Sequence, residues 1–324
     1  MKALFASAVV ILTPALCLAA AGEWRPTRNI EVIVGTPAGG PLDATARLIQ
    51  KYLEPRNAGS AVLVMNKPGG SHVIAMQYLN AHTGDAHYIS MALPNLLTNR
   101  ITGAHPLTYT DVTPLALLTS EYVGMWVRAD SPIRSASDLI ARMRVQPDSL
   151  SFAITSAASG NHIAAGVVLK AAGVDLKRVH FVPYKGSAET TVAVMGGHVD
   201  VLMATSGSAW KYAQGGKLRP LAIAAPRRLT GDGATVPTWK EVGVNAVADN
   251  WRAIIGPQGL STVQIAYWDQ TLSAMVKSPE WQQALKANQW EDQYLNSAGA
   301  MKFLEQEYKE LAALLTELGE VKSR

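Results

Sequence analysis

Cysteine is almost absent from this sequence: Cys17 is the only one among 324 residues. Residues 1–21 are identified as a secretory signal peptide, because a basic start is followed by an apolar stretch and the small residues Ala19-Ala20-Ala21. Cleavage after Ala21 would remove Cys17, so the mature chain would lack disulfides and thiol chemistry. We therefore expect an exported chain in the periplasm of a Gram-negative bacterium. Lipid attachment at Cys17 is the alternative, and the bulky Leu16 disfavours it.

Long apolar runs and an excess of one charge are also missing. Beyond residue 21 no stretch approaches the roughly 18 apolar residues of a membrane span. The 29 Lys and Arg residues and 25 Asp and Glu residues are spread along the chain without a polybasic run. This distribution argues against nucleic acid as a partner. We predict a soluble α/β protein with room for two domains.

The patterns of catalytic and metal sites are absent as well. Ser159 and His162 are close in sequence, but no orienting third residue, G-x-S-x-G elbow or H-E-x-x-H zinc helix accompanies them. The seven histidines are scattered without metal-ligand spacing, and no clustered carboxylates suggest an acid–base pair. We therefore expect no enzyme activity, no metal and no cofactor.

A glycine-rich turn follows the apolar run of residues 30–34. Gly40 is expected to cap a helix that begins at Pro41, with Asp43 in its first turn. Glycines allow the backbone to approach a ligand, and the N–H groups at a helix start favour an anion. Pro41 and Leu42 stand where a P-loop has Lys and Ser or Thr, so a nucleotide site is not indicated. A turn whose glycines serve geometry alone is the alternative.

Apolar runs alternate with helical patterns along the whole chain, which predicts parallel sheets with ligands at the carboxyl ends of strands. Three such ends are rich in small residues: residues 36–43, 66–72 and 155–162. The first and third contain no Lys or Arg, which argues against a phosphate ester and favours a carboxylate held by amides and hydroxyls. The predicted strands are residues 30–34, 61–65, 88–92, 122–127, 150–154, 179–182, 199–203 and 220–224.

Capping patterns mark several helix starts. The pairs Ser135 with Asp138, Thr238 with Glu241 and Ser261 with Gln264 fit the capping box, and Ser278 precedes a proline. Asp43 and Arg47 are four residues apart, so we expect an ion pair on one helix, with Asp43 ordering the turn. For His72 we expect exposure at a helix start, and a hydrogen bond into the ligand site is the alternative.

These residues resemble the Bug (TctC-like) receptors of tripartite tricarboxylate transporters over nearly the whole mature chain. The markers are Gly39-Gly40-x-x-Asp43-x-x-Ala46-Arg47, Asn66-Lys67-Pro68-Gly69, Val182-Pro183-Tyr184-Lys185-Gly186, Gly196-Gly197-His198-Val199-Asp200, Gly216-Lys217-Leu218-Arg219-Pro220-Leu221-Ala222 and Val236-Pro237-Thr238-x-x-Glu241-x-Gly243. The resemblance implies a two-lobed, periplasmic-binding-protein-like (type II) α/β fold with a ligand cleft between the lobes. It implies one domain of residues 22–124 and 247–324, and a second of residues 125–246.

The resemblance also implies a ligand site and partners. The ligand-binding residues carried over by position are Thr36, Ala38, Gly39, Gly40 and Asp43 in the first lobe, and Thr155, Ser156, Ala157, Ser159, His162, Tyr184 and Ala204 in the second. The expected function is a monomeric solute-binding receptor that closes on a small carboxylate and delivers it to membrane transporter subunits. A receptor of the same fold that serves a sensor kinase is the alternative.

Overall fold

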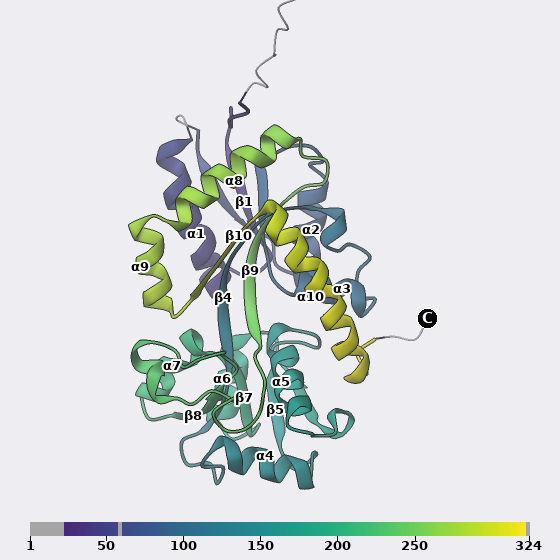
Figure 1. Cartoon of the computed structure of the whole chain (residues 1–324), viewed down its shortest axis with the longest axis vertical. Helices are drawn as coiled ribbons and strands as arrows, with labels where there is room; N and C mark the ends of the chain where they lie inside the picture. The colour runs from purple at the N-terminus through teal and green to yellow at the C-terminus, as the bar shows by residue number, and fades with distance from the viewer. Residues whose placement is uncertain (1–22, 58–59, 322–324) are drawn as a thin grey trace, which may run out of the picture.

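The structure is a computed structural model and describes residues 23–57 and 60–321. The predicted signal peptide and Cys17 lie outside these residues. The chain forms two α/β lobes, joined by long strands that run between them in the centre of Figure 1. Within the described ranges, no helix has the length and apolar character needed to cross a membrane.

The first lobe is built on a sheet in the order β2-β1-β3-β9-β4-β10. Its strands are β1 (Ile30–Val34), β2 (Val62–Asn66), β3 (Tyr88–Ala92), β4 (Thr113–Arg128), β9 (Asp249–Gly256) and β10 (Glu291–Asn296). Its helices are α1 (Pro41–Leu53), α2 (Val73–Asn80), α3 (Asn95–Ile101), α8 (Thr262–Val276), α9 (Pro279–Asn288) and α10 (Ser297–Glu317). Apolar residues of α1, α8 and α9 pack in one cluster with β1 and β3, while those of α2, α3 and α10 belong to another.

The second lobe has the same kind of sheet, in the order β8-β4-β7-β5-β6. Its own strands are β5 (Ser151–Ile154), β6 (His180–Pro183), β7 (Val201–Thr205) and β8 (Leu218–Ile223). Its helices are α4 (Ala136–Val145), α5 (Gly160–Ala171), α6 (Ser187–Met195) and α7 (Ser206–Gln214).

Strand β4 belongs to both sheets and changes its partner at the hinge. Tyr122 pairs with Asp249 of β9, whereas the next residue, Val123, pairs with Thr205 of β7. The second crossing lies just before β9, where the Ala248 amide donates to the Ala224 carbonyl of the second lobe. These crossings lie close to the proposed domain limits at residues 124 and 247, and that division remains a prediction.

Strand directions place the carboxyl ends of both sheets at the boundary between the lobes. β1, β2 and β3 run parallel to one another, and β3 and β4 are each antiparallel to β9, so these strands run toward the second lobe with β4. β7 is antiparallel to β4, and β5 and β6 are parallel to β7, so they run back toward the first lobe. The loop after β1 and the loop after β5 each lie at the point where the strand order of their sheet reverses. Ligands bind at this topological switch point in such sheets.

The predicted fold class is confirmed, and most predicted strands differ from the observed ones only at their ends. The strand expected at residues 122–127 is wrong in extent, because it is the end of the longer β4, and β9 and β10 were not predicted. The caps Ser135, Ser261 and Ser278 are confirmed. Thr238 and Glu241 exchange the predicted hydrogen bonds, but they close a turn rather than start a helix.

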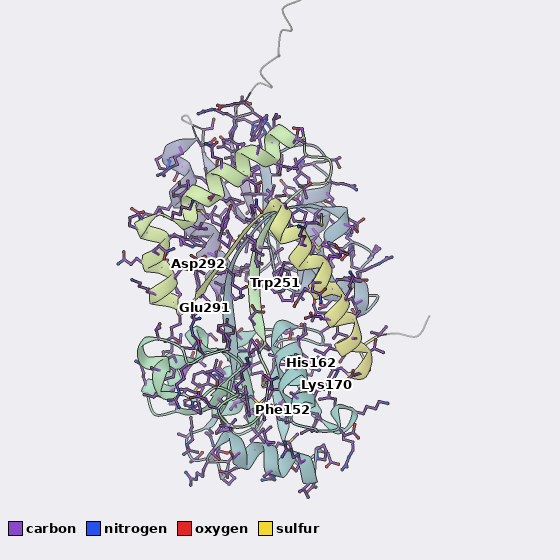
Figure 2. All side chains as sticks on the ribbon, viewed as in Figure 1. Phe152, His162, Lys170, Trp251, Glu291 and Asp292 are labelled. Atoms are coloured by element: carbon purple, nitrogen blue, oxygen red, sulfur yellow. The ribbon has the colours of Figure 1, made fainter. Side chains whose placement is uncertain are left out.

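Two carboxyl groups meet where α10 crosses the hinge. Asp249 accepts hydrogen bonds from Ser120 and from Gln293 Nε2 (3.1 Å), and burial raises the pKa of its carboxyl. Burial, together with repulsion from Asp249, raises the pKa of Glu307 on α10 to about 7. Figure 2 shows Trp251 on β9 at this level, and its indole packs edge-on against Phe303 of α10.

We expect Glu307→Gln to stabilise the protein in a pH-dependent way. The folded chain keeps Glu307 protonated up to about pH 7, whereas the unfolded chain ionises it near 4.5, so wild-type stability falls as pH rises through this interval. Glutamine mimics the neutral carboxyl. The increase in the free energy of unfolding over wild type should therefore grow across this pH interval and stay constant above it. Urea unfolding at about pH 5 and pH 8 measures this gain. The exposed Glu305→Gln on the same helix is the control, and an equal gain at both pH values would contradict the assignment.

Candidate functional site

The loop after β1 is braced by Asp43 of α1. Gly39 has a positive φ of 84°, and its amide donates to Asp43 Oδ2 at 2.9 Å. Asn66 and Arg47 donate to the same carboxylate at 3.0 and 2.8 Å, so the predicted Asp43–Arg47 ion pair is confirmed. Burial raises the pKa of Asp43, but Arg47, the Gly39 amide and Asn66 together outweigh it and hold the pKa below its ordinary value. Asp43 therefore orders the turn as an anion.

The loop after β5 is braced by His162 of α5. Ala158 has a positive φ of 54°, and its amide donates to Nδ1 of the buried His162 at 3.0 Å. Ser159 caps the helix through its Oγ, which accepts the His162 amide at 3.4 Å. Burial lowers the pKa of His162 to about 4, so the imidazole is neutral near pH 7. Since Nδ1 accepts, Nε2 carries the proton, and this buried N–H has no hydrogen-bond partner among the described residues.

The two lobes thus hold their loops in the same way. In each, a residue with positive φ is followed by the helix cap, and the third helical residue accepts the amide of the positive-φ residue. We call this third residue the brace: Asp43 in the first lobe and His162 in the second. The Gly39 amide is occupied by its brace, so an anion at this loop would meet the amides that follow it.

The first loop is open in front of its glycines. A Cβ built on Gly39 meets no heavy atom within 4 Å, and one built on Gly40 meets only the Pro37 carbonyl at 3.8 Å. Ala38 is exposed. Thr36 is half-buried, and its Oγ1 is buried without a hydrogen-bond partner in the described part of the chain. The first loop therefore has open space at Gly39 and Gly40, at the carboxyl edge of the first sheet.

The remaining predicted site residues lie at the carboxyl edge of the second sheet. Thr155 and Ser156 are half-buried after β5, and Ala157 is exposed. Tyr184 is half-buried after β6, and Ala204 is buried near the end of β7, where its carbonyl accepts from Trp126 Nε1 at 3.2 Å. The topology brings these residues to one edge, and their contact with a ligand stays a prediction.

Two residues at this boundary were not predicted from the sequence, and the expectation for a third is corrected. Ser206 follows β7, and its buried Oγ has no partner within the described ranges. Asn250 of β9 lies against the second loop, because a Cβ on Gly160 would come within 2.7 Å of its Oδ1. His72 is half-buried, which corrects the expectation of exposure. The position of Ser206, a small polar residue directly after a strand, could have indicated it as a site residue. Asn250 could not be predicted because its strand, β9, was not predicted.

A buried ion pair joins the two hinge strands. Arg252 of β9 donates to Glu121 Oε2 of β4 at 2.6 Å and to Thr45 Oγ1 of α1 at 3.2 Å. The Trp290 indole donates to Glu121 Oε1 at 2.6 Å, and the Arg252 guanidinium lies 4.3 Å from the centre of its ring. This network connects the hinge to α1, the helix that begins at the first loop.

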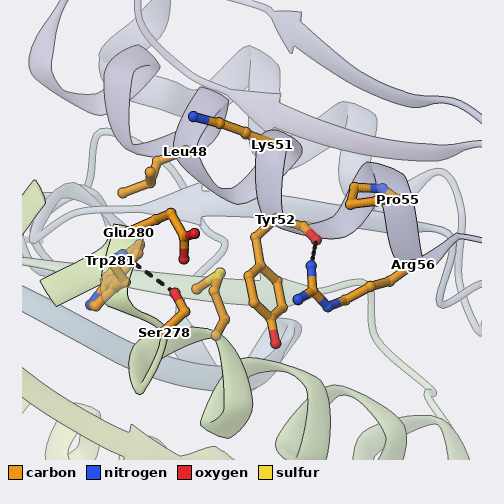
Figure 3. Close-up of a pocket in the computed structure, with 9 residues that line it drawn as sticks. Leu48, Lys51, Tyr52, Pro55, Arg56, Ser278, Glu280 and Trp281 are labelled. Atoms are coloured by element: carbon orange, nitrogen blue, oxygen red, sulfur yellow. Dashed lines mark hydrogen bonds between the residues drawn. The ribbon is translucent and has the colours of Figure 1, made fainter. Parts of the chain in front are cut away.

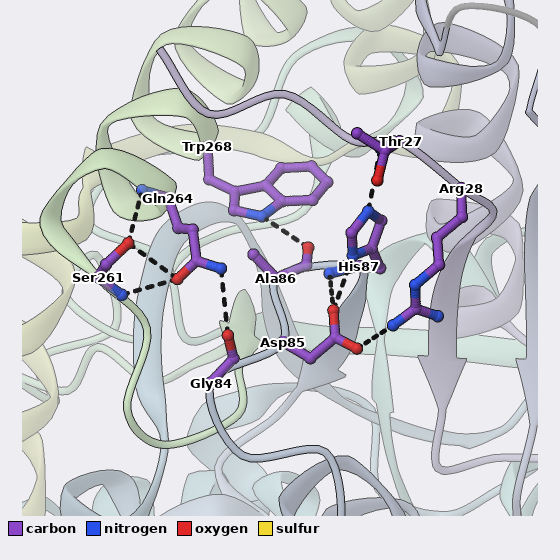
Figure 4. Close-up of polar contacts among 9 residues, drawn as sticks. All are labelled: Thr27, Arg28, Gly84, Asp85, Ala86, His87, Ser261, Gln264 and Trp268. Atoms are coloured by element: carbon purple, nitrogen blue, oxygen red, sulfur yellow. Dashed lines mark hydrogen bonds and ion pairs between the residues drawn. The ribbon is translucent and has the colours of Figure 1, made fainter. Parts of the chain in front are cut away.

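A histidine–carboxylate contact between His87 and Asp85 is structural. His87 Nδ1 lies 2.7 Å from Asp85 Oδ1, and the Thr27 amide donates to His87 Nε2 at 3.1 Å (Figure 4). Asp85 also contacts Arg28. These residues precede β3 and therefore lie at the amino end of the sheet, away from the loops at its carboxyl edge. They fasten the start of the described chain to the first lobe.

Two pockets lie apart from the predicted site residues. One pocket, of about 180 Å³, lies on the first lobe between the end of α1 and the start of α9, and Tyr52, Arg56 and Trp281 are among its lining residues (Figure 3). Another, of about 170 Å³, lies between α9 and the Leu229–Thr230 loop of the second lobe. Within the described residues, no group of three or more His, Asp or Glu is arranged to hold a metal ion.

Comparison with known proteins identifies the family. The family model described as "Tripartite tricarboxylate transporter family receptor" matches residues 45–320. The chain belongs to this receptor family. A UPF0065 protein from the gbd 5' region of Cupriavidus necator is 26% identical over 301 residues, which cover 92% of this chain and 90% of that protein. The predicted resemblance to the Bug receptors is therefore confirmed.

Two solved structures have the same fold. The periplasmic binding protein BugD matches with a TM-score of 0.78 at 22% identity, covering 92% of this chain and 100% of that one. Rpa4515 from R. palustris, solved with adipate, also matches with a TM-score of 0.78, at 24% identity, covering 91% and 98%. At these identities the structural likeness establishes the two-lobed fold and nothing about this chain's ligand.

Proposed function

We propose that this chain is a periplasmic receptor that captures a small carboxylate between its lobes and delivers it to a tripartite tricarboxylate-type transporter. The observation that carries the proposal is the pair of braced loops at the facing carboxyl edges of the two sheets. Each loop offers amides or hydroxyls without a nearby Lys or Arg in its own sequence. Such donors suit a carboxylate, and two half-sites on opposite lobes favour the closed form when the ligand is bound.

Binding without catalysis is part of the proposal. Ser159 and His162 do not form a nucleophile–base pair, because Ser159 Oγ contacts the His162 backbone amide while the imidazole accepts from Ala158. A nucleophilic serine needs a base that takes its proton. In this arrangement the two residues shape the loop.

A thermal-shift screen of the mature protein tests the proposal. We expect at least one acid from a panel of small mono- and dicarboxylates to raise the melting temperature, while its amide does not, because a ligand of the folded state stabilises by RT ln(1 + [L]/Kd). A panel without any shift would contradict the proposal.

The variant Gly40→Val tests whether the ligand binds at the first loop. Gly40 has φ −83° and ψ 171°, which a β-branched residue adopts readily, and the space around its Cβ is open. The variant should keep the ligand-free melting temperature of the wild type and lose the shift, because valine fills the space proposed for the carboxylate. A shift equal to that of the wild type would show that the ligand is not at this loop.

A further inference from the structure

The segment after β2 has an unusual backbone. Gly69, Gly70, Ser71 and His72 all have positive φ, with values of 129°, 56°, 51° and 74°. Ser71 and His72 carry side chains that make this conformation costly, so the surrounding structure must hold it in place. One such contact is the hydrogen bond from Asn99 Nδ2 to the Ser71 carbonyl at 2.9 Å. Non-glycine residues in such conformations are concentrated at functional sites.

The left-handed backbone directs His72 toward the first loop. A Cβ built on Gly35 would lie 2.7 Å from His72 Cγ, so the missing side chain of Gly35 makes room for the imidazole. Gly35 directly precedes Thr36, whose Oγ1 is buried without a partner in the described chain. Since β1 and β2 are neighbouring parallel strands, the imidazole lies beside the first loop at the edge facing the second lobe.

The imidazole is neutral and available. The His72 side chain is half-buried, and no hydrogen bond to its ring nitrogens is found among the described residues. Burial lowers the pKa of His72 to about 4. The ring therefore offers one N–H donor and one acceptor near pH 7 and carries no positive charge.

We infer that His72 is a specificity-determining residue of the ligand site, an inference that rests on the proposed function. Its imidazole, packed on Gly35 at the start of the first loop, selects a carboxylate ligand that carries a second hydrogen-bonding group, such as a hydroxyl, next to the carboxylate. A donor and acceptor fixed at the site favour such a ligand over an acid that leaves them unpaired.

The test uses acids that differ by one hydroxyl: lactate and propionate, malate and succinate, 2-hydroxyglutarate and glutarate. Titration calorimetry should show that wild type prefers the hydroxy acid in at least one pair. His72→Gly should weaken binding of that hydroxy acid on the order of 10-fold or more while changing the plain acid much less. A wild type with no such preference, or an unchanged preference in His72→Gly, would overturn the inference. A wild type that binds none of these acids or the screening panel would overturn the proposed function with it.

Controls separate this role from a structural one. The ligand-free melting temperature of His72→Gly should equal or exceed that of wild type, because glycine adopts positive φ without strain. Gln289→Gly is the matched control, since Gln289 also has positive φ (55°) but ends α9. It should leave the acid preference unchanged.

His72→Asn should retain part of the preference, because asparagine tolerates this backbone and keeps a donor and an acceptor. A preference lost equally in His72→Asn and His72→Gly, with both variants less stable than wild type, would show a structural role instead.

Discussion

Replacing Arg252 with methionine should lower the free energy of unfolding by about 3–5 kcal/mol, because it leaves Glu121 buried without its cation. Glu121 and Arg252 are both nearly inaccessible to solvent, and the hydrogen bond from Trp290 to Glu121 does not replace the lost charge. The hinge strands β4 and β9 are joined by this pair, so the loss falls on the part of the fold that connects the lobes. Urea unfolding near pH 7 measures the effect.

The exposed pair Glu305–Lys309 on α10 provides the control. Lys309→Met should change the free energy of unfolding by no more than about 0.5 kcal/mol, because solvent screens an exposed ion pair on a helix. Combining Arg252→Met with Glu121→Gln should recover much of the stability, since no buried charge is then left alone. A loss below about 1 kcal/mol in Arg252→Met would show that water or rearrangement compensates Glu121.

The buried Arg252–Glu121 ion pair explains why part of the fold could not be predicted from the sequence. β1 and β3 are apolar runs that any partner strand can bury, and both were predicted at their observed limits. β9 begins with Asp249, Asn250 and Trp251 and contains Arg252, so its pattern is not that of a buried strand. The burial of Arg252 depends on its ion pair with Glu121, which lies far away in the sequence. β10 is a polar edge strand that pairs with β4, so pairing rather than composition defines it.

The loops of the candidate site were predictable to the extent that they depend on local contacts. Glycine and small residues after strands located both loops, and the four-residue spacing of Asp43 and Arg47 gave their ion pair. Nothing in the sequence marks Ala158 as a residue with positive φ, because alanine has no preference for it. His72 was expected to be exposed, but it packs on Gly35, a contact between the ends of two strands that local patterns do not contain.

His162→Ala should weaken binding of the acid found in the thermal-shift screen by on the order of 10-fold to 100-fold. The Ala158 amide would lose its acceptor, and the costly positive φ of Ala158 would lose the contact that holds it. The loop after β5 would then relax away from the conformation that presents Ser156 and Ser159. Titration calorimetry with the same acid on wild type and variant measures the loss.

Adding Ala158→Gly to His162→Ala distinguishes bracing from direct contact. Glycine adopts positive φ without a Cβ penalty, so the loop keeps its shape without the imidazole and most of the affinity should return. Ala157→Gly in the same background is the matched control, because Ala157 does not have positive φ, and it should restore nothing. If Ala158→Gly also restores nothing, the buried Nε2–H of His162 contacts the carboxylate itself, and the second lobe recognises its ligand through the imidazole rather than through the loop that His162 orders.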